Sequence, residues 1–463
     1  MLVRLIIVLA VFALSTFLFY KASGSLSFKK LNMTSAMYYY ILAFNLIGGS
    51  LIYIGLRKHY LIQKVADAST IDTGYYALAY TVIMFPLTLI LVKKLLSSIR
   101  PRRSVKKFIE EDIHINYDMT TIQSATFFLM GVCTLATVYV FLHLGYFPLI
   151  AMFRGGNLDA MRQSGSRFFQ GNQYIKNLFM VTLTPFVSYL TYIYFRVTKS
   201  KTWMVMFIYM ALLSVIVLTY DFSKSPIITY LLGIYLIEVV LGNIRNSKRF
   251  NRLVLASVAL LLFFYVIVLN AGASLYSIYS GPLGRILFTQ IATMFLHFDA
   301  FPARTPFLKG ASFNGWMSPL FPAAAGERSG RVVMSIYNAK GIQDNTAGVM
   351  NTIFIGEAYA NFGFAGVIAA PIIFGIIIGL FAYGLPNLKK RPTSLLIYVQ
   401  MTLIFVTIIE GGFVDIFYSA SAIFLIAVTI MLSILSGAPF RKERTALGRQ
   451  RDEMAARKEN IGQ

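Results

Sequence analysis

The chain has 463 residues, of which 57% are hydrophobic and only 13% are charged, against about 25% charged residues in a typical soluble domain. Its formal net charge is +23, from 42 Lys and Arg against 19 Asp and Glu, and its mean hydropathy is +0.67. These values exclude a soluble enzyme, a disordered chain and a disulfide-stapled secreted protein, because the single cysteine, Cys133, has no partner. We expect an all-α polytopic membrane protein in which residues 1–463 form a single integral membrane domain.

Apolar stretches of about 17–25 residues, the length that a helix needs to cross a bilayer, recur along the chain. We expect the first to be a retained helix rather than a cleaved signal peptide, because only Arg4 precedes its apolar run and no small-x-small site follows it. The sequence predicts eleven spans, near residues 3–20, 37–56, 74–93, 123–144, 177–196, 203–220, 226–242, 253–271, 363–384, 394–411 and 416–436.

Basic residues concentrate in alternate connections between these spans, and cytoplasmic loops carry an excess of Lys and Arg. Six segments hold 27 of the 42 basic residues and are predicted to be cytoplasmic: 21–36, 93–122, 196–202, 243–252, 385–393 and the tail 437–463. The N-terminus is then outside and the C-terminus inside. We interpret the basic tail as a solvated stop-transfer flank, with contact to anionic lipid as the alternative.

Two connections on the predicted outer side are long, residues 145–176 and 272–362. Within the second, Arg285 to Asp299 has apolar residues at helical spacing and is predicted to lie along the membrane interface. Arginine presents a planar fork of donors that matches phosphate oxygens in pairs. The arginines in these loops therefore favour a lipid phosphate or diphosphate as ligand, with outer-leaflet headgroups or local acids as the alternative: Arg154, Arg162, Arg167, Arg285, Arg304, Arg328 and Arg331.

The sequence lacks the residues that several other kinds of chemistry require. No nucleotide-binding motif occurs, and the four histidines are scattered without metal-ligand spacing, so the sequence predicts no metal, no cofactor and no nucleic-acid partner. A transporter is disfavoured because intramembrane charges are few and lie near the ends of spans. These charges are Asp221, Lys224, Glu238, Glu410 and Asp415.

Four sequence features together resemble the Wzy-type polymerases of O-antigen and capsule repeat units. Arg154 is followed by ten residues and then Gly165, and Arg304 stands at the same spacing from Gly315. Lys224 precedes a helix where many family members place Ser-Arg. The most specific piece is the stretch from Gly356 to Gly366 that leads into a span, with Glu357, Tyr359, Asn361 and Gly363. A kink lined by glycines is the structural alternative for that stretch.

The resemblance implies the second type of lipid-linked glycosyltransferase architecture (GT-C-like), in a bacterial inner membrane with the active site facing the periplasm. The implied reaction moves a growing glycan from undecaprenyl diphosphate to the non-reducing end of an undecaprenyl-diphosphate-linked repeat unit. Donor, acceptor and membrane lipid would be the partners, with a chain-length regulator protein as a further candidate. Ligation of finished glycan to another acceptor and lipid-linked oligosaccharide flipping remain alternatives.

The resemblance and the loop arginines together define the expected site. The general base is expected among Glu357, Asp299 and His297, with Glu357 first because its motif places it at a loop-to-helix junction. His297 precedes Arg304 and does not match the histidine motif of the related ligases. The residues expected to bind the diphosphate are Arg154, Arg162, Arg167, Arg304, Arg328, Arg331 and Lys224, and Gly165, Gly315, Tyr359, Asn361 and Gly363 are expected to be structural.

Overall fold

The computed structural model describes residues 1–99, 103–115, 119–147, 165, 169–221, 223, 225–245, 278–279, 281–344 and 347–436. Every regular element within these ranges is a helix. Nine of these helices are long and apolar enough to span a membrane: Leu2–Lys30, Met33–Ile54, Ala68–Ile99, Met119–Leu144, Ile175–Thr198, Lys201–Leu218, Phe354–Asn387, Pro392–Gly411 and Val414–Leu435. The protein is a multi-pass membrane protein.

These nine helices coincide with nine of the eleven predicted spans. The stretch predicted at 226–242 forms the shorter helix α11, Ser225–Val240. At 1.5 Å rise per residue, its 16 residues extend about 24 Å, less than the ~30 Å of a hydrocarbon core. The span predicted at 253–271 lies outside the described residues.

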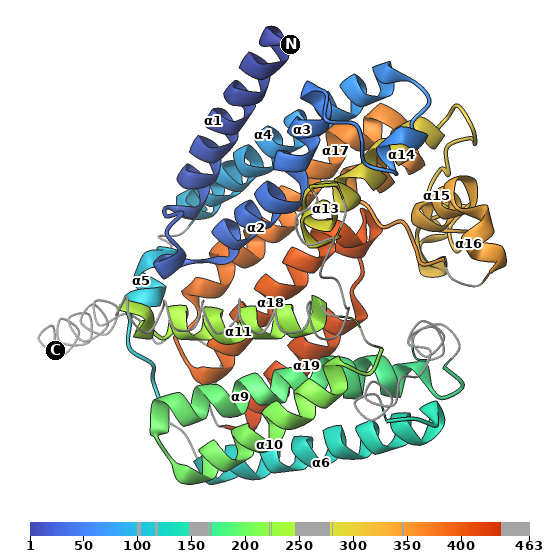
Figure 1. Ribbon diagram of the computed structural model, residues 1–463. Coiled ribbons are helices and arrows are strands. Elements are labelled where there is room, and N and C mark those ends of the chain that lie inside the picture. Colours follow the sequence, from blue (N-terminus) through green and yellow to red (C-terminus); the bar gives the residue numbers. More distant parts are fainter. Residues whose placement is uncertain are drawn as a thin grey trace, which may run out of the picture.

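The helices form two groups joined by a central helix (Figure 1). In the upper group of this view, α17 packs along α4, which also packs along α1. In the lower group, α9 packs along α10 and α6. Helix α18 lies between them and is the most deeply buried of the spans. The bounds are α1 Leu2–Ser23, α4 Ala68–Ile99, α6 Met119–Leu144, α9 Leu183–Thr198, α10 Lys201–Leu218, α17 Phe354–Gly384 and α18 Pro392–Gly411.

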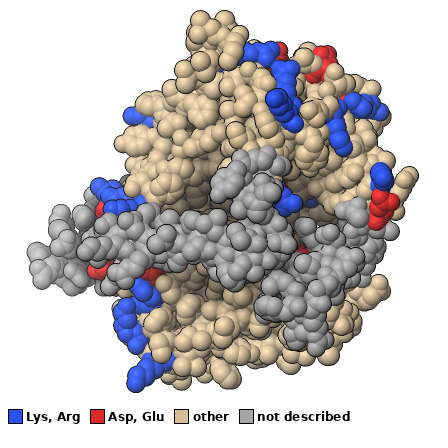
Figure 2. All heavy atoms as spheres, viewed as in Figure 1, with Lys and Arg blue, Asp and Glu red and all other residues tan. Residues whose placement is uncertain are grey.

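The remaining elements connect these helices or lie at their ends. On the face shown in Figure 2, charged side chains gather at the left edge and toward the top and upper right, and the tan surface visible between these groups carries few charges. Such a distribution is typical of a protein whose middle faces hydrocarbon. Further helices are α2 Met33–Ile41, α3 Ile47–Ile54, α5 Val105–Glu110, α14 Gln290–Ala300, α15 Ser329–Tyr337, α16 Ala339–Gln343 and α19 Ala420–Leu435.

Helix α17 begins earlier than predicted and is kinked. It starts at Phe354 instead of following residue 362, and the chain bends at Gly363, where φ is 60° and ψ is −144°. That conformation lies outside the region that L side chains ordinarily adopt, which explains a glycine here. The glycine kink considered as an alternative from the sequence is therefore present. Both sides of the bend contact α4: Phe354 lies against Phe85 before it, and Gly375 and Gly379 lie against Thr88 and Val92 after it.

Helix α14 is confirmed as a helix, but its placement differs from the interfacial position that we expected. Its residues Ile291 to Ala300 are all buried, and the helix packs against α17, α4 and α15. An interfacial helix keeps one polar face toward water. Here the polar side chains find partners inside the protein instead, as described below. Helix α14 therefore links the spans to the surface helices α15 and α16, which lie at the opposite end of the bundle from α5 (Figure 1).

Candidate functional site

Arg328, immediately before α15, holds two carboxylates from two different spans. Its Nε and Nη2 donate to Oε1 and Oε2 of Glu357, both at 3.2 Å, and its Nη1 donates to Oδ1 of Asp415 at 3.0 Å. Nη2 also donates to the carbonyl oxygen of Gly411 at 3.0 Å. We call Arg328, Glu357 and Asp415, with the backbone of Gly411 to Val414, the Arg328 centre. It joins α15, α17 and the connection between α18 and α19.

Local backbone geometry allows these groups to approach. Glu357 lies in the first turn of α17, where the helix dipole favours a negative charge, and its Oε2 also accepts from the backbone N–H of Val414 at 3.0 Å. Gly412 adopts φ 131°. A Cβ at this position would lie 2.3 Å from Glu357 Oε2 and 2.6 Å from Arg328 Nη2. Position 412 therefore requires glycine for both its conformation and its space.

The donors of Arg328 are almost fully used. A guanidinium has five N–H groups, and the contacts to Glu357, Asp415 and Gly411 occupy four of them. Burial lowers the pKa of Arg328, but the charges of Glu357 and Asp415 outweigh burial and raise its pKa above the ordinary value. Arg328 is thus a fixed cation between two anions. To donate two hydrogen bonds to a phosphate, its guanidinium would have to release a carboxylate.

The two carboxylates differ in access. The Glu357 side chain is 2% exposed and accepts three hydrogen bonds, whereas the Asp415 side chain is 31% exposed and accepts from Arg328. A general base must reach the proton that it removes. The geometry therefore favours Asp415 over Glu357 for contact with a ligand. Glu357 is placed to position Arg328.

A second ion pair lies at the C-terminal end of α14. Asp299 Oδ2 accepts from Nε of Arg304 at 2.9 Å and from the hydroxyl of Tyr337 at 2.5 Å, and Oδ1 accepts from the backbone N–H of Ala66 at 2.8 Å. The Arg304 guanidinium also lies over the Tyr337 ring, 4.9 Å from its centroid. The Asp299 side chain is 4% exposed, whereas Arg304 is 39% exposed. Arg304 therefore keeps donors accessible, and Asp299 is enclosed.

His297 connects the two ion pairs but is sealed from solvent. Its Nδ1 contacts the carbonyl oxygen of Thr293 at 2.8 Å, and its Nε2 lies 3.2 Å from the hydroxyl of Ser329, the residue after Arg328. Burial lowers the pKa of His297 to about 4, against the smaller opposing effect of its contact with Thr293. The side chain is therefore neutral near pH 7. With both ring nitrogens engaged, it is placed as a structural link rather than as a base.

The motif residues around Glu357 organise the loop between α14 and α15. Asn361 donates from Nδ2 to Ser312 and to the carbonyl oxygen of Glu357, and its Oδ1 accepts from the backbone N–H of Gly310. Tyr359 stacks on Phe298 of α14, with ring centroids 4.0 Å apart. Tyr359 and Asn361 therefore both hold neighbouring segments against α17.

The expected diphosphate-binding residues are only partly brought together. Arg328 and Arg331 lie one turn apart on α15, and Arg331 is exposed without a side-chain hydrogen bond or ion pair to the described residues. Gly315 is exposed, and the carbonyl oxygen of Gly165 accepts from Lys176 Nζ at 3.1 Å. Arg154, Arg162, Arg167 and Lys224 lie outside the described residues.

Asp415 and Tyr337 were not among the residues that we expected in the site. Asp415 and Glu410 were noticed as charges near the end of a span, and such acids ordinarily have a polar partner inside the protein. From the position of Asp415 near the end of a span, the sequence could have predicted that this acid pairs with an arginine of the outer loops. Glu410 accepts from Asn45 at 2.5 Å and from Gln290 at 2.9 Å and is adjacent to Gly411 of the Arg328 centre. Nothing in the sequence identified Tyr337.

Within the described residues, no group of three or more His, Cys, Asp or Glu side chains is arranged to hold a metal ion. Comparisons of the chain with protein-family models, with curated proteins and with solved structures found no match.

Proposed function

We propose that the protein polymerises lipid-linked oligosaccharide repeat units. It would transfer the growing glycan from undecaprenyl diphosphate to the non-reducing end of an incoming undecaprenyl-diphosphate-linked unit, at the periplasmic face of a bacterial inner membrane. The observation that carries the proposal is the Arg328 centre, a partly exposed guanidinium and a partly exposed carboxylate fixed together at the ends of spans. This combination supplies a carboxylate that a ligand can reach and a cation that keeps that carboxylate ionised.

The reaction needs both groups. The acceptor hydroxyl attacks the anomeric carbon, the bond from that carbon to the diphosphate oxygen breaks, and the lipid diphosphate leaves with the bonding electron pair. Cations placed in advance stabilise the charge that develops on this leaving group. In our proposal Arg304 and Arg331 take this part, together with Arg154, Arg162, Arg167 and Lys224, and no metal ion is required.

The acceptor proton passes to a carboxylate. Asp415 is our preferred base, because its side chain is 31% exposed whereas Glu357 and Asp299 are nearly enclosed. Arg328 would keep Asp415 ionised and fixed in direction, and Glu357 would hold Arg328. This assignment modifies the part first expected for Glu357: it becomes a positioning residue.

The test is polymer synthesis by the purified protein from lipid-linked repeat units, with product length read on gels. We expect polymer to form in the presence of EDTA, and activity that returns only on adding a divalent ion would contradict the role given to the arginines. Surface polysaccharide from a deletion strain gives a second readout. A single-repeat cap supports a polymerase, whereas free lipid-linked polymer indicates a ligase.

Conservative substitutions separate phosphate binding from structure. Arg304→Lys and Arg154→Lys keep the charge but lose the two-pronged geometry, so we expect normal protein levels and short products. Arg285→Lys is the matched control, because Arg285 is exposed outside the Arg328 centre and should tolerate the change. Full-length polymer from both variants would mean that neither arginine grips the diphosphate.

A further inference from the structure

At the end of the bundle opposite α15, a cavity of about 610 Å³ is lined by basic side chains. It lies between the end of α1, the end of α4, α5 and the connection after α11. We call it the lysine cavity. Its charged lining consists of five basic residues and one acid: Lys29, Lys30, Lys93, Arg103, Lys106 and Glu110.

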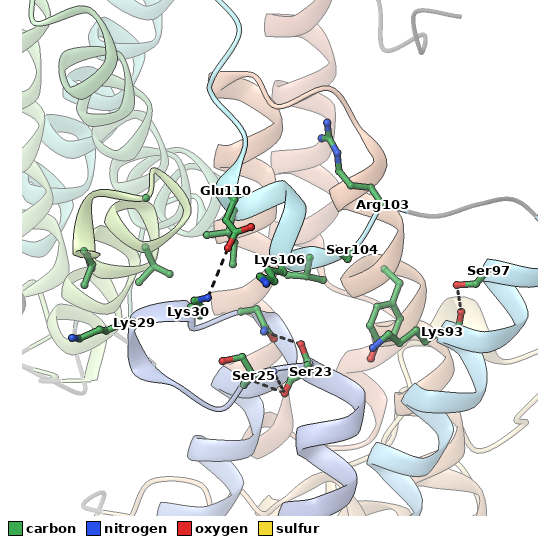
Figure 3. Close-up of a pocket in the computed structure, with 18 residues that line it drawn as sticks. Ser23, Ser25, Lys29, Lys30, Lys93, Ser97, Arg103, Ser104, Lys106 and Glu110 are labelled. Carbon is green, nitrogen blue, oxygen red and sulfur yellow. Dashed lines mark hydrogen bonds and ion pairs between the residues drawn. The ribbon is translucent and has the colours of Figure 1, made fainter. Parts of the chain in front are cut away.

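The charges in this cavity are incompletely paired. Lys30 lies 3.7 Å from Glu110, in a pair whose side chains are about half exposed, so the contact contributes little. Lys106 makes no side-chain hydrogen bond or ion pair with the described residues. Figure 3 shows Lys30 directed toward Glu110 and Lys106 close to both, whereas the Arg103 guanidinium points away from them. Arg103 is paired with Glu111 instead.

Lys93 is held in a fixed position in the wall of the lysine cavity. Lys93 donates to the carbonyl oxygens of Lys21 and Ala22 at 3.3 and 3.2 Å, and its ammonium lies 5.7 Å from the centroid of the Tyr383 ring. Its carbonyl partners are neutral, so its positive charge is not cancelled by a carboxylate. The hydroxyls of Ser25 and Ser104 also line the cavity and offer further donors, whereas the Ser23 hydroxyl donates to the carbonyl oxygen of Ser25. The lining thus suits a group with a negative charge and several acceptor oxygens, such as a phosphate.

An apolar groove borders the same segment of chain. It runs along α1 and is lined by Leu9, Phe12, Phe17, Tyr20 and Leu26, among others. Leu26 is next to Ser25, which lines the lysine cavity, so the groove ends where the cavity begins. Phe17 and Tyr20 are about half exposed. A groove for hydrocarbon that leads to a cationic cavity matches the acyl chain and the phosphate of one lipid.

We propose that the lysine cavity binds the phosphate of an anionic phospholipid whose acyl chain lies in the α1 groove. The apolar run of α1 ends at Tyr20 and Lys21, and the phosphates of a bilayer lie beyond the apolar part of a span, so a phosphate-binding group is expected near this end of the helix. This end of α1 is also the one that the basic-residue distribution predicts to be cytoplasmic, where anionic lipid attracts clustered lysines. The proposal does not depend on the enzymatic function proposed above.

The test uses detergent-purified, delipidated full-length protein titrated with phosphatidylglycerol, and native mass spectrometry to count bound lipids. We expect one phosphatidylglycerol to bind in preference to phosphatidylcholine. The variant Lys30→Gln/Lys106→Gln should weaken this binding about thirtyfold, because each of the two lysines near an anionic headgroup contributes about 1 kcal/mol. The matched control is Lys199→Gln/Lys201→Gln, which removes two exposed lysines from another segment predicted to be cytoplasmic and should change affinity less than about twofold.

Two results would overturn the proposal. Equal weakening in the cavity variant and the control would show diffuse attraction to the surface rather than a site. Displacement of phosphatidylglycerol by inorganic phosphate, at constant ionic strength, would show that the cavity takes a free phosphate instead of a lipid. Equal melting temperatures of the two variants establish that any loss of binding is not a loss of fold.

Discussion

The Arg328 centre and the lysine cavity show two ways in which this protein keeps charge at the ends of its spans. In the Arg328 centre, one guanidinium meets two carboxylates and uses four of its donors within the protein. In the lysine cavity, Arg103 pairs with Glu111 outside the lining, and the four lysines have Glu110 as the acid in the lining and remain partly exposed. Paired, enclosed charges fix the geometry of neighbouring helices, whereas unpaired charges around a cavity remain available to a ligand. The predictions below test that difference.

The largest expected effect is the removal of the cation from the Arg328 centre. Arg328→Ala leaves the enclosed Glu357 carboxylate without its counter-charge, and we expect a loss of about 3 kcal/mol of stability. The measurement is the unfolding midpoint of the purified protein in denaturant. Arg331→Ala, one turn along α15 at an exposed position, is the control and should stay within about 0.5 kcal/mol of the wild type. Equal losses would contradict the structural part given to Arg328.

The second prediction concerns pH and asks whether the interior next to the Arg328 centre is sealed. The pKa of His297 is about 4 in the folded protein and about 6.5 in an unfolded chain. The unfolded state therefore binds more protons between these values, and stability is lost as pH falls from 6.5 to 4, by about 3 kcal/mol. Above pH 6.5 His297 contributes no pH dependence.

The measurement is the unfolding midpoint of the wild type at a series of pH values, compared with His297→Gln. Glutamine does not titrate, so we expect the difference between the two proteins to change steadily between pH 6.5 and 4. A constant difference across this range would mean that His297 is accessible to protons in the folded state.

The third prediction separates the two carboxylates of the Arg328 centre. Glu357→Gln places an amide where three donors converge, so we expect a loss of about 1–3 kcal/mol of stability together with loss of activity. Asp415→Asn, at the more exposed position, should leave the melting temperature nearly unchanged and abolish polymer formation. Both readings come from the same purified samples. If the Asp415→Asn variant remained active, Asp415 would not be the general base, and one of the other candidate residues would have that role.

The sequence predicted most of the spans because each depends on a local property, an uninterrupted apolar run of sufficient length. It also identified Glu357, Asp299, His297 and the arginines that the structure brings near them. It did not predict that Arg328 pairs with Asp415, 87 residues away, or that Asp299 meets Ala66 and Tyr337. Those contacts depend on how spans pack, which no local pattern encodes. The burial of α14 was missed for the same reason: its amphipathic pattern is equally compatible with a membrane interface.

The smallest expected effect is on the stability of the lysine cavity itself. Lys30→Gln/Lys106→Gln should leave the unfolding midpoint within about 0.5 kcal/mol of the wild type when lipid is absent, because the ion pair lost among the described residues, Lys30 with Glu110, is about half exposed. Adding phosphatidylglycerol should then raise the midpoint of the wild type more than that of the variant, since a ligand that binds the folded state stabilises it by mass action. A marked loss of stability without lipid would mean that these lysines, like Arg328, serve the fold, and the contrast between the two regions would disappear.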